Sequence, residues 1–82
     1  MKRLRWAALE EQLFKAIRDG DHPGVEAALR DGVSVDCSDS TGWTALMRAT
    51  YHGRNRVAKL LLARGADVHR QNSRGETAVF IA

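Results

Sequence analysis

Three histidines and one cysteine are the side chains of this sequence that could bind a metal ion. They are His22, His52, His69 and Cys37, and no two of them have a ligand spacing such as Cys-x-x-Cys or His-x-x-x-His. Each falls on a different expected turn or loop. We therefore expect no metal site and no other cofactor.

Covalent chemistry has little support from the sequence. Cys37 as a nucleophile would need a neighbouring base and a lowered pKa, whereas Asp36 and Asp39 would raise its pKa if they lay close to it. No Gly-x-Ser-x-Gly motif, phosphate-binding loop or pair of catalytic carboxylates is present. The sequence predicts a protein that is not an enzyme.

Two aromatic residues have the character of binding residues. Trp43 lies between a turn glycine and Thr44, where the hydrophobic pattern does not require a core side chain, and Tyr51 lies at the end of the helix expected to follow. Large amphipathic rings supply binding energy at a low entropic cost. The structural alternative is that Trp43 packs on its own hairpin and Tyr51 covers a helix end.

Basic residues are concentrated in the second half of the chain, although the net charge is only +3. They could contact an acidic peptide or the phosphates of a nucleic acid. We favour a solvated surface over a nucleic-acid site, because no nucleic-acid-binding motif accompanies them. The residues concerned are Arg54, Arg56, Lys59, Arg70 and Arg74.

Length and composition restrict the fold that must position these side chains. The 82 residues make one small domain, and 44% hydrophobic with 28% charged residues is typical of a globular protein. The longest apolar stretches are too short to span a membrane. The basic start of the chain resembles a signal peptide, but Glu10 and Glu11 interrupt the apolar core that such a signal needs. We expect a cytoplasmic protein, with the nucleus as an alternative.

A period of 33 residues is the most informative feature of the chain, because a period of this size indicates stacked helical units. Three pairs of glycines have this spacing: Gly20 and Gly53, Gly32 and Gly65, and Gly42 and Gly75. Apolar and helix-capping residues keep the same offset: Leu13 and Leu46, Ala16 and Ala49, Leu29 and Leu62, Val35 and Val68, and Thr44-Ala45 and Thr77-Ala78. Apolar spacing predicts helices near residues 9–18, 24–30, 45–51 and 55–63, with a fifth that begins at Ala78.

Three segments carry a resemblance to a known family. Thr44-Ala45-Leu46-Met47-Arg48-Ala49 resembles the ankyrin-repeat signature Thr-Pro-Leu-His-x-Ala. The run from Leu60 to His69 resembles the second helix of that repeat and the hairpin strand after it, and the run from Asp39 to Thr44 resembles the hairpin tip. The resemblance implies an all-α solenoid of antiparallel helix pairs joined by hairpin-like loops. Its expected parts are a basic extension at 1–8, a capping-like repeat at 9–38, a second repeat at 39–71 and a truncated third repeat at 72–82.

The sequence departs from the ankyrin pattern at the signature histidine, which the family uses as a hydrogen-bonding link between hairpins. Met47 and Phe80 replace it, and Phe14 lies near the corresponding position of the first unit. We expect these three side chains to substitute packing for the polar link.

The same resemblance implies a protein or peptide partner, bound without chemistry by the hairpin tips and the concave face of the first helices. The contact positions that it implies are Arg18, Asp19, Ser38, Ser40, Thr41, Trp43, Tyr51, His52, Gln71, Ser73, Arg74 and Glu76. Two alternatives stay open: a binder of nucleic acid or another acidic ligand through the basic half, and a structural fragment that contacts only further repeats.

The third unit has only 11 of its 33 residues, so Val79, Phe80 and Ile81 lack the helix that would cover them. We expect either a fragment of a longer array or self-association through this uncapped end.

Overall fold

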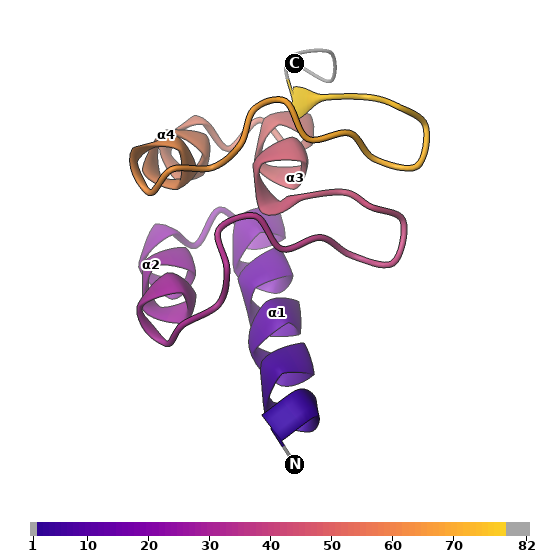
Figure 1. Cartoon of the computed structure of the whole chain (residues 1–82). Coiled ribbons are helices and arrows are strands. Elements are labelled where there is room, and N and C mark those ends of the chain that lie inside the picture. Colours follow the sequence, from indigo (N-terminus) through magenta and orange to yellow (C-terminus); the bar gives the residue numbers. More distant parts are fainter. Residues whose placement is uncertain (1, 79–82) are drawn as a thin grey trace.

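The computed structural model describes the backbone of residues 2–78 and the side chains of residues 8–78. This part of the chain folds into four helices and contains no extended strand: α1 (Lys2–Asp19), α2 (His22–Arg30), α3 (Ala45–Tyr51) and α4 (Asn55–Ala63). Figure 1 shows α1 and α3 stacked in one layer and α2 and α4 in a second layer, with two hairpin loops projecting to the same side. The all-α arrangement of paired helices is the one that the period predicts.

The helix boundaries agree with the expected ones in the second unit and differ in the first. The predicted ranges 45–51 and 55–63 match α3 and α4. Helix α2 starts at His22, two residues before the predicted start, because the Asp21 side chain accepts the Gly24 N–H at 3.1 Å and so caps the helix. Helix α1 starts at Lys2 and runs through the expected extension 1–8. Its first residues are mostly helix-forming basic residues and alanine with few large apolar side chains, so the hydrophobic pattern placed the start of the helix later.

The recurring glycines end helices and tighten turns in left-handed conformations, as predicted. Gly20 has φ of 70° and Gly53, its counterpart, has φ of 69°. The N–H of the residue after Gly20 donates to the Ala16 carbonyl at 2.8 Å, and Arg54, after Gly53, donates to Ala49 at the same distance. This bond ends a helix where the chain reverses. The two turns are therefore copies of one another.

The core lies between the two layers. The largest fully buried side chains are contributed by all four helices: Leu13, Ile17, Val25, Met47, Val57 and Leu61. Each contributes about 1.5–3 kcal/mol of burial free energy. Ala78, where the expected fifth helix begins, is also buried. The rest of the expected fifth helix, and Phe80 with it, lies outside the described residues.

Met47 substitutes packing for the signature histidine, as expected, and also forms a polar contact. The side chain is only 1% exposed. Its Sδ accepts the Thr44 N–H at 3.4 Å, while the Thr44 hydroxyl accepts the Met47 N–H at 3.2 Å. Two free N–H groups at the start of α3 are thus satisfied by a reciprocal cap in which sulfur takes the usual place of an oxygen.

Polar contacts also join successive units. The Arg54 guanidinium donates to the Arg18 carbonyl at 2.7 and 3.2 Å. The Asp67 N–H donates to Asp36 Oδ1 at 2.8 Å, and the Ser73 N–H donates to the Thr41 carbonyl at 3.2 Å. One contact lies at the helix turn, one between the loops and one between the hairpins. The first two contacts hold the second unit in register on the first, and the third holds the start of the third unit on the hairpin of the second.

Candidate functional site

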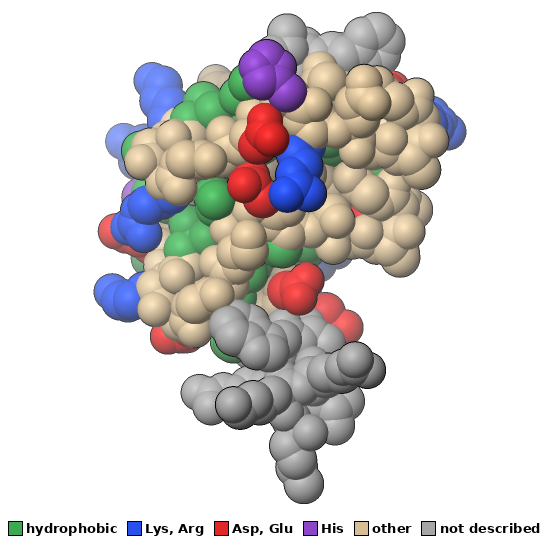
Figure 2. Space-filling view, in the orientation of Figure 1, with side chains coloured by type: hydrophobic (Ala, Val, Ile, Leu, Met, Phe, Trp, Pro, Cys, Tyr) green, Lys and Arg blue, Asp and Glu red, His purple; other side chains and the backbone are tan. Residues whose placement is uncertain are grey.

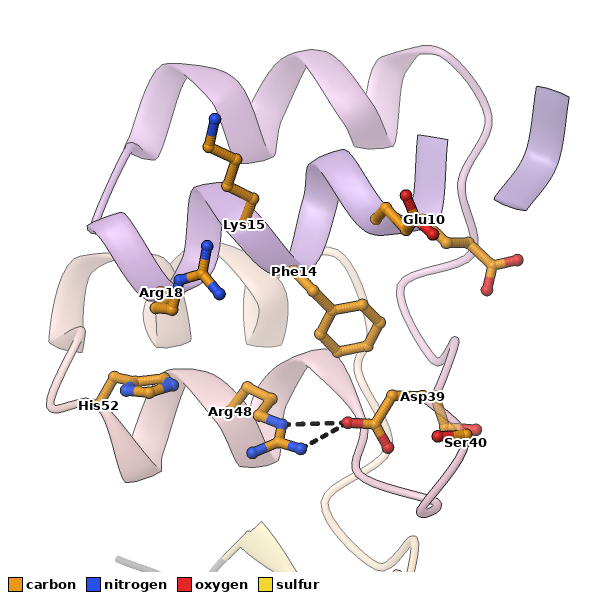
Figure 3. A pocket seen from close by; sticks show the side chains of 10 residues that line it. Glu10, Phe14, Lys15, Arg18, Asp39, Ser40, Arg48 and His52 are labelled. Carbon is orange, nitrogen blue, oxygen red and sulfur yellow. Dashed lines mark hydrogen bonds and ion pairs between the residues drawn. The ribbon is translucent and has the colours of Figure 1, made fainter. Parts of the chain in front are cut away.

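An open groove of about 850 Å³ lies between α1 and α3, on the side of the projecting hairpins. One wall is formed by side chains of α1: Glu10, Glu11, Phe14, Lys15 and Arg18. The opposite wall is formed by the first hairpin and by α3 with the residue that follows it: Ser38, Ser40, Asp39, Arg48 and His52. Figure 3 shows these side chains from both walls, with the Phe14 ring between them. The groove thus contains one large apolar side chain surrounded by charged and polar groups.

Asp39 organises the hairpin tip that forms one end of the groove. Its Oδ1 accepts the Thr41 N–H at 2.9 Å, the Thr41 hydroxyl at 2.7 Å and the Trp43 N–H at 3.0 Å. Its Oδ2 accepts Nη2 of Arg48 at 2.6 Å and Nε at 3.2 Å. Partial burial alone would raise the pKa of Asp39, but the hydrogen bonds from Thr41, Arg48 and Trp43 outweigh it and hold the pKa below its ordinary value. The carboxylate is therefore ionised at neutral pH.

Asn72 occupies the equivalent position in the second hairpin, 33 residues later. Its Oδ1 accepts the N–H groups of Arg74 and Glu76 at 2.9 and 3.0 Å, and its Nδ2 donates to Glu76 Oε1 at 3.0 Å. An aspartate and an asparagine thus build the same type of turn through a side-chain oxygen that accepts backbone N–H groups. The two projecting tips have one backbone design and different charges.

Arg48 connects the groove to an aromatic row beside it. Its guanidinium carbon lies 4.4 Å from the centroid of the Trp43 ring, which is a cation–π distance. The Trp43 ring meets Tyr51 edge-to-face, with centroids 5.4 Å apart, and Tyr51 meets His52 in the same way at 5.2 Å. Trp43 also packs partly against the core. Trp43 is therefore partly packed within the protein, as the structural alternative predicts. Tyr51 is 62% exposed and faces outward.

The structure brings some of the predicted contact residues together and separates others. Four of them line the groove: Arg18, Ser38, Ser40 and His52. Trp43 and Tyr51 lie beside it, and Thr41 is exposed at the first tip. Asp19 lies instead on a smaller hollow of about 380 Å³ between α1 and α2. The remaining four belong to the second hairpin and do not line the groove: Gln71, Ser73, Arg74 and Glu76.

Sequence reasoning missed six groove residues as contact positions, which are Glu10, Glu11, Phe14, Lys15, Asp39 and Arg48. Helical spacing offered a signal for some of them. Glu10 lies eight residues before Arg18, and Arg48 lies four before His52, so each shares a helix face with a residue that was predicted. Asp39 gave no such signal, because its ion pair with Arg48 spans nine residues and depends on the hairpin.

The residues considered for metal or nucleophilic chemistry lie on different parts of the fold. His22 is in the first turn of α2, where its Nδ1 lies 3.8 Å from Glu26, and His52 follows α3. Within residues 8–78, no three histidine, cysteine or acidic side chains are grouped closely enough to bind a metal ion. Burial, with smaller contributions from Glu10 and Asp36, raises the pKa of Cys37 to about 11. Its thiol is therefore protonated at neutral pH and a poor nucleophile.

Charged side chains of both signs are mixed on the face of the molecule that Figure 2 draws. Figure 2 shows acidic and basic groups close to one another in the middle of this face, whereas the projecting side is mostly uncharged. None of the described helices has the length and apolar character needed to cross a membrane.

Comparison with known proteins identifies the family. A sequence model described as "Ankyrin repeats (3 copies)" matches residues 9–72. The chain belongs to the ankyrin-repeat family. This family is typically non-catalytic, and its repeats are generally protein–protein interaction modules.

Three relatives contain a region similar to this chain within a much longer sequence. The mouse 2-5A-dependent ribonuclease is 39% identical over 74 residues, which are 89% of this chain and 10% of that protein. Mouse ankyrin repeat and SAM domain-containing protein 6 is 43% identical over 67 residues, 80% of this chain and 8% of that protein. The bovine inactive serine/threonine-protein kinase TEX14 is 34% identical over 79 residues, 96% of this chain and 5% of that protein. The chain thus spans a tenth or less of each relative, and the ribonuclease and the inactive kinase match it through the repeat region.

Proposed function

We propose that this chain binds a partner protein through the groove between α1 and α3 and the aromatic row beside it. The observation that carries the proposal is the position of the groove: it lies on the side of the projecting hairpins, the partly buried Phe14 lines it, and the exposed Tyr51 lies beside it. A few aromatic anchors surrounded by polar groups are typical of the centre of a protein interface. The twelve contact positions predicted from the resemblance remain part of this proposal.

The nucleic-acid alternative has weaker support, because two basic side chains of the second half, Arg54 and Arg64, already have partners within the protein. The Arg54 guanidinium donates to the Arg18 carbonyl, and Arg64 lies 3.8 Å from Glu26 across the two units. Phosphate binding would have to compete with these contacts. The groove itself contains three carboxylates, which repel a polyanion.

Site-specific photo-crosslinking tests the proposal. A benzophenone amino acid at Ser40, on the groove wall, is expected to form a protein adduct in an extract of the source cells. The same probe at Lys59, an exposed position on α4 outside the groove, is the matched control. Equal adducts at both positions, or none at Ser40, would contradict binding at the groove. An adduct at Ser40 that is removed by ribonuclease or deoxyribonuclease would favour the nucleic-acid alternative.

A pair of alanine variants tests the aromatic row. Tyr51 and Leu62 are the two exposed large hydrophobic residues among the described side chains, at 62% and 47% exposure, and Leu62 lies on α4. Tyr51→Ala is expected to weaken the Ser40 adduct at least about tenfold, as a residue worth more than 1.4 kcal/mol of binding would. Leu62→Ala should leave it unchanged. Equal losses in both variants would indicate a general effect of reduced stability.

A further inference from the structure

The groove has opposite charges at its two ends. Along the wall formed by α1, Glu10 and Glu11 come first, Phe14 follows, and Lys15 and Arg18 come last. Figure 3 shows Glu10 on the same side as Asp39 and Ser40, and Lys15 and Arg18 on the same side as His52. The Phe14 ring separates the two groups of side chains.

Contacts within the protein leave these end charges largely uncompensated. On the wall opposite α1, Asp39 and Arg48 neutralise one another through a 2.6 Å ion pair. No described side chain forms an ion pair with Glu10, Glu11 or Lys15. Arg18 lies 4.0 Å from Asp19, but both side chains are more than half exposed, and such surface pairs contribute little. Glu11 and Lys15 lie one helical turn apart and offset one another in part, so Glu10 and Arg18 are the end charges most available to a ligand.

Helix geometry sets the distance between the two charged ends. Glu10, Phe14 and Arg18 follow one another at four-residue intervals on one face of α1, so the outermost charges lie eight residues, or about 12 Å, apart at 1.5 Å per residue. Successive side chains of an extended peptide point to opposite faces, and four of its residues cover about 13 Å. A ligand that matches both ends thus has opposite charges four residues apart, with an apolar side chain midway between them, on the same face, to contact Phe14.

From this arrangement we infer that the groove selects a dipolar, extended segment of the partner protein. Its acidic side chain faces Lys15 and Arg18, and its basic side chain faces Glu10 and Glu11. The inference rests on the proposed function, since it specifies the chemistry of the segment bound at the same groove. Charge complementarity of this kind excludes unsuitable ligands, because a segment with two like charges places one of them against a repelling end.

Three blocked peptides on a common frame test the charge preference directly. The dipolar probe is acetyl-Gly-Glu-Ala-Leu-Ala-Lys-Gly-amide, and the controls replace its lysine by glutamate or its glutamate by lysine. Titration into the ¹⁵N-labelled 82-residue chain at low salt reports weak binding through amide shifts of groove residues. We expect the dipolar peptide to bind at least about tenfold more tightly than either control, and the preference to shrink near 0.15 M salt.

Variants in which the charges at one end of the groove are reversed should change which peptide binds most tightly. The double variant Glu10→Lys with Glu11→Lys makes both ends basic and should prefer the peptide with two glutamates. Lys15→Glu with Arg18→Glu makes both ends acidic and should prefer the peptide with two lysines. Arg56→Glu with Lys59→Glu changes the same number of charges on α4 and should keep the wild-type order. Circular dichroism of each variant verifies that it remains folded.

The outcomes separate this inference from the proposed function. Equal shifts with all three peptides, or an unchanged order in the reversal variants, would overturn the dipolar preference and leave binding at the groove in place. An absence of groove shifts with every peptide would also overturn it. The crosslinking at Ser40 then decides independently whether the groove binds a protein at all.

Discussion

Asp39 has two roles: its Oδ1 holds the hairpin turn, and its Oδ2 pairs with Arg48. Two substitutions at this position should separate these roles. Asn at this position keeps an Oδ1 that accepts the Thr41 and Trp43 N–H groups, as Asn72 does in the second hairpin, but it loses the ion pair with Arg48. The two paired side chains are 25% and 31% exposed, so the pair lies between a surface contact and a buried one. Asp39→Asn is therefore expected to lower the free energy of unfolding by about 1 kcal/mol.

Asp39→Ala removes the turn acceptor as well. The Thr41 and Trp43 N–H groups then lose their partners, at about 0.5–1.5 kcal/mol each, although water can replace the bond at the exposed Thr41. The total expected loss is about 2–3 kcal/mol. At about 4–8 °C per kcal/mol for a domain of this size, the asparagine variant should melt about 4–8 °C below wild type, and the alanine variant at least about 8 °C below it.

Urea unfolding followed by circular dichroism at pH 7 and at pH 3 measures both roles. Because the pKa of Asp39 is lowered in the folded state, its charge stabilises the fold above the ordinary pKa of about 3.9, and this contribution is lost as the pH falls through the folded-state pKa. The difference between wild type and Asp39→Asn should therefore shrink at pH 3. Equal losses for asparagine and alanine at pH 7 would refute the claim that the turn acceptor and the ion pair are separable.

Three further predictions concern other parts of the fold. Because burial raises the pKa of Cys37 from 9.0 to about 11, the stability due to its protonated thiol should be complete below pH 9 and lost between pH 9 and 11. At pH 8, Cys37 of the folded protein should be alkylated much more slowly than Cys37 of the protein unfolded in urea. Equal alkylation rates would contradict this. Gly53→Ala, with φ of 69° and no atom near its added carbon, should cost about 1 kcal/mol, whereas Gly42→Ala also meets the second hairpin at 3.2 Å and should cost more in thermal melts. Met47→Leu keeps the packing volume but leaves the buried Thr44 N–H without an acceptor, so a loss of about 1–3 kcal/mol is expected in urea unfolding, and a neutral result would show that the sulfur contact is unimportant.

The parts of the fold that depend on local spacing could be predicted from the sequence. The 33-residue period located the helix-ending glycines, and the Thr44 cap located the start of α3. The start of α1 could not be found in this way, because its first turns have few of the large apolar side chains on which the expectation relied.

The groove could be predicted only in part. Arg18 and His52 were found through the resemblance, but the walls are brought together by packing of α1 against α3, and local sequence patterns do not show which exposed residues then face one another. The ion pair of Asp39 with Arg48 could not be predicted for the same reason, because the hairpin turn and the start of α3 must both form before the two side chains meet. The pKa of Cys37 could also be predicted only in part. The sequence identified Asp36 as a neighbour that raises this pKa, whereas in the structure burial raises it most.

The three polar contacts between units have a mechanical consequence. The first two units contact each other through one helix pair in each layer and through the Arg54 and Asp67 bonds. Tension applied at the C-terminal end would therefore load the Ser73 contact with Thr41 and then the Arg54 and Asp67 contacts before the interior of the first unit. In a single-molecule pulling experiment, the second unit would peel away as a block while the long first helix stayed docked on its partner. An array with this arrangement of contacts would unfold one unit at a time, starting from the end that is pulled.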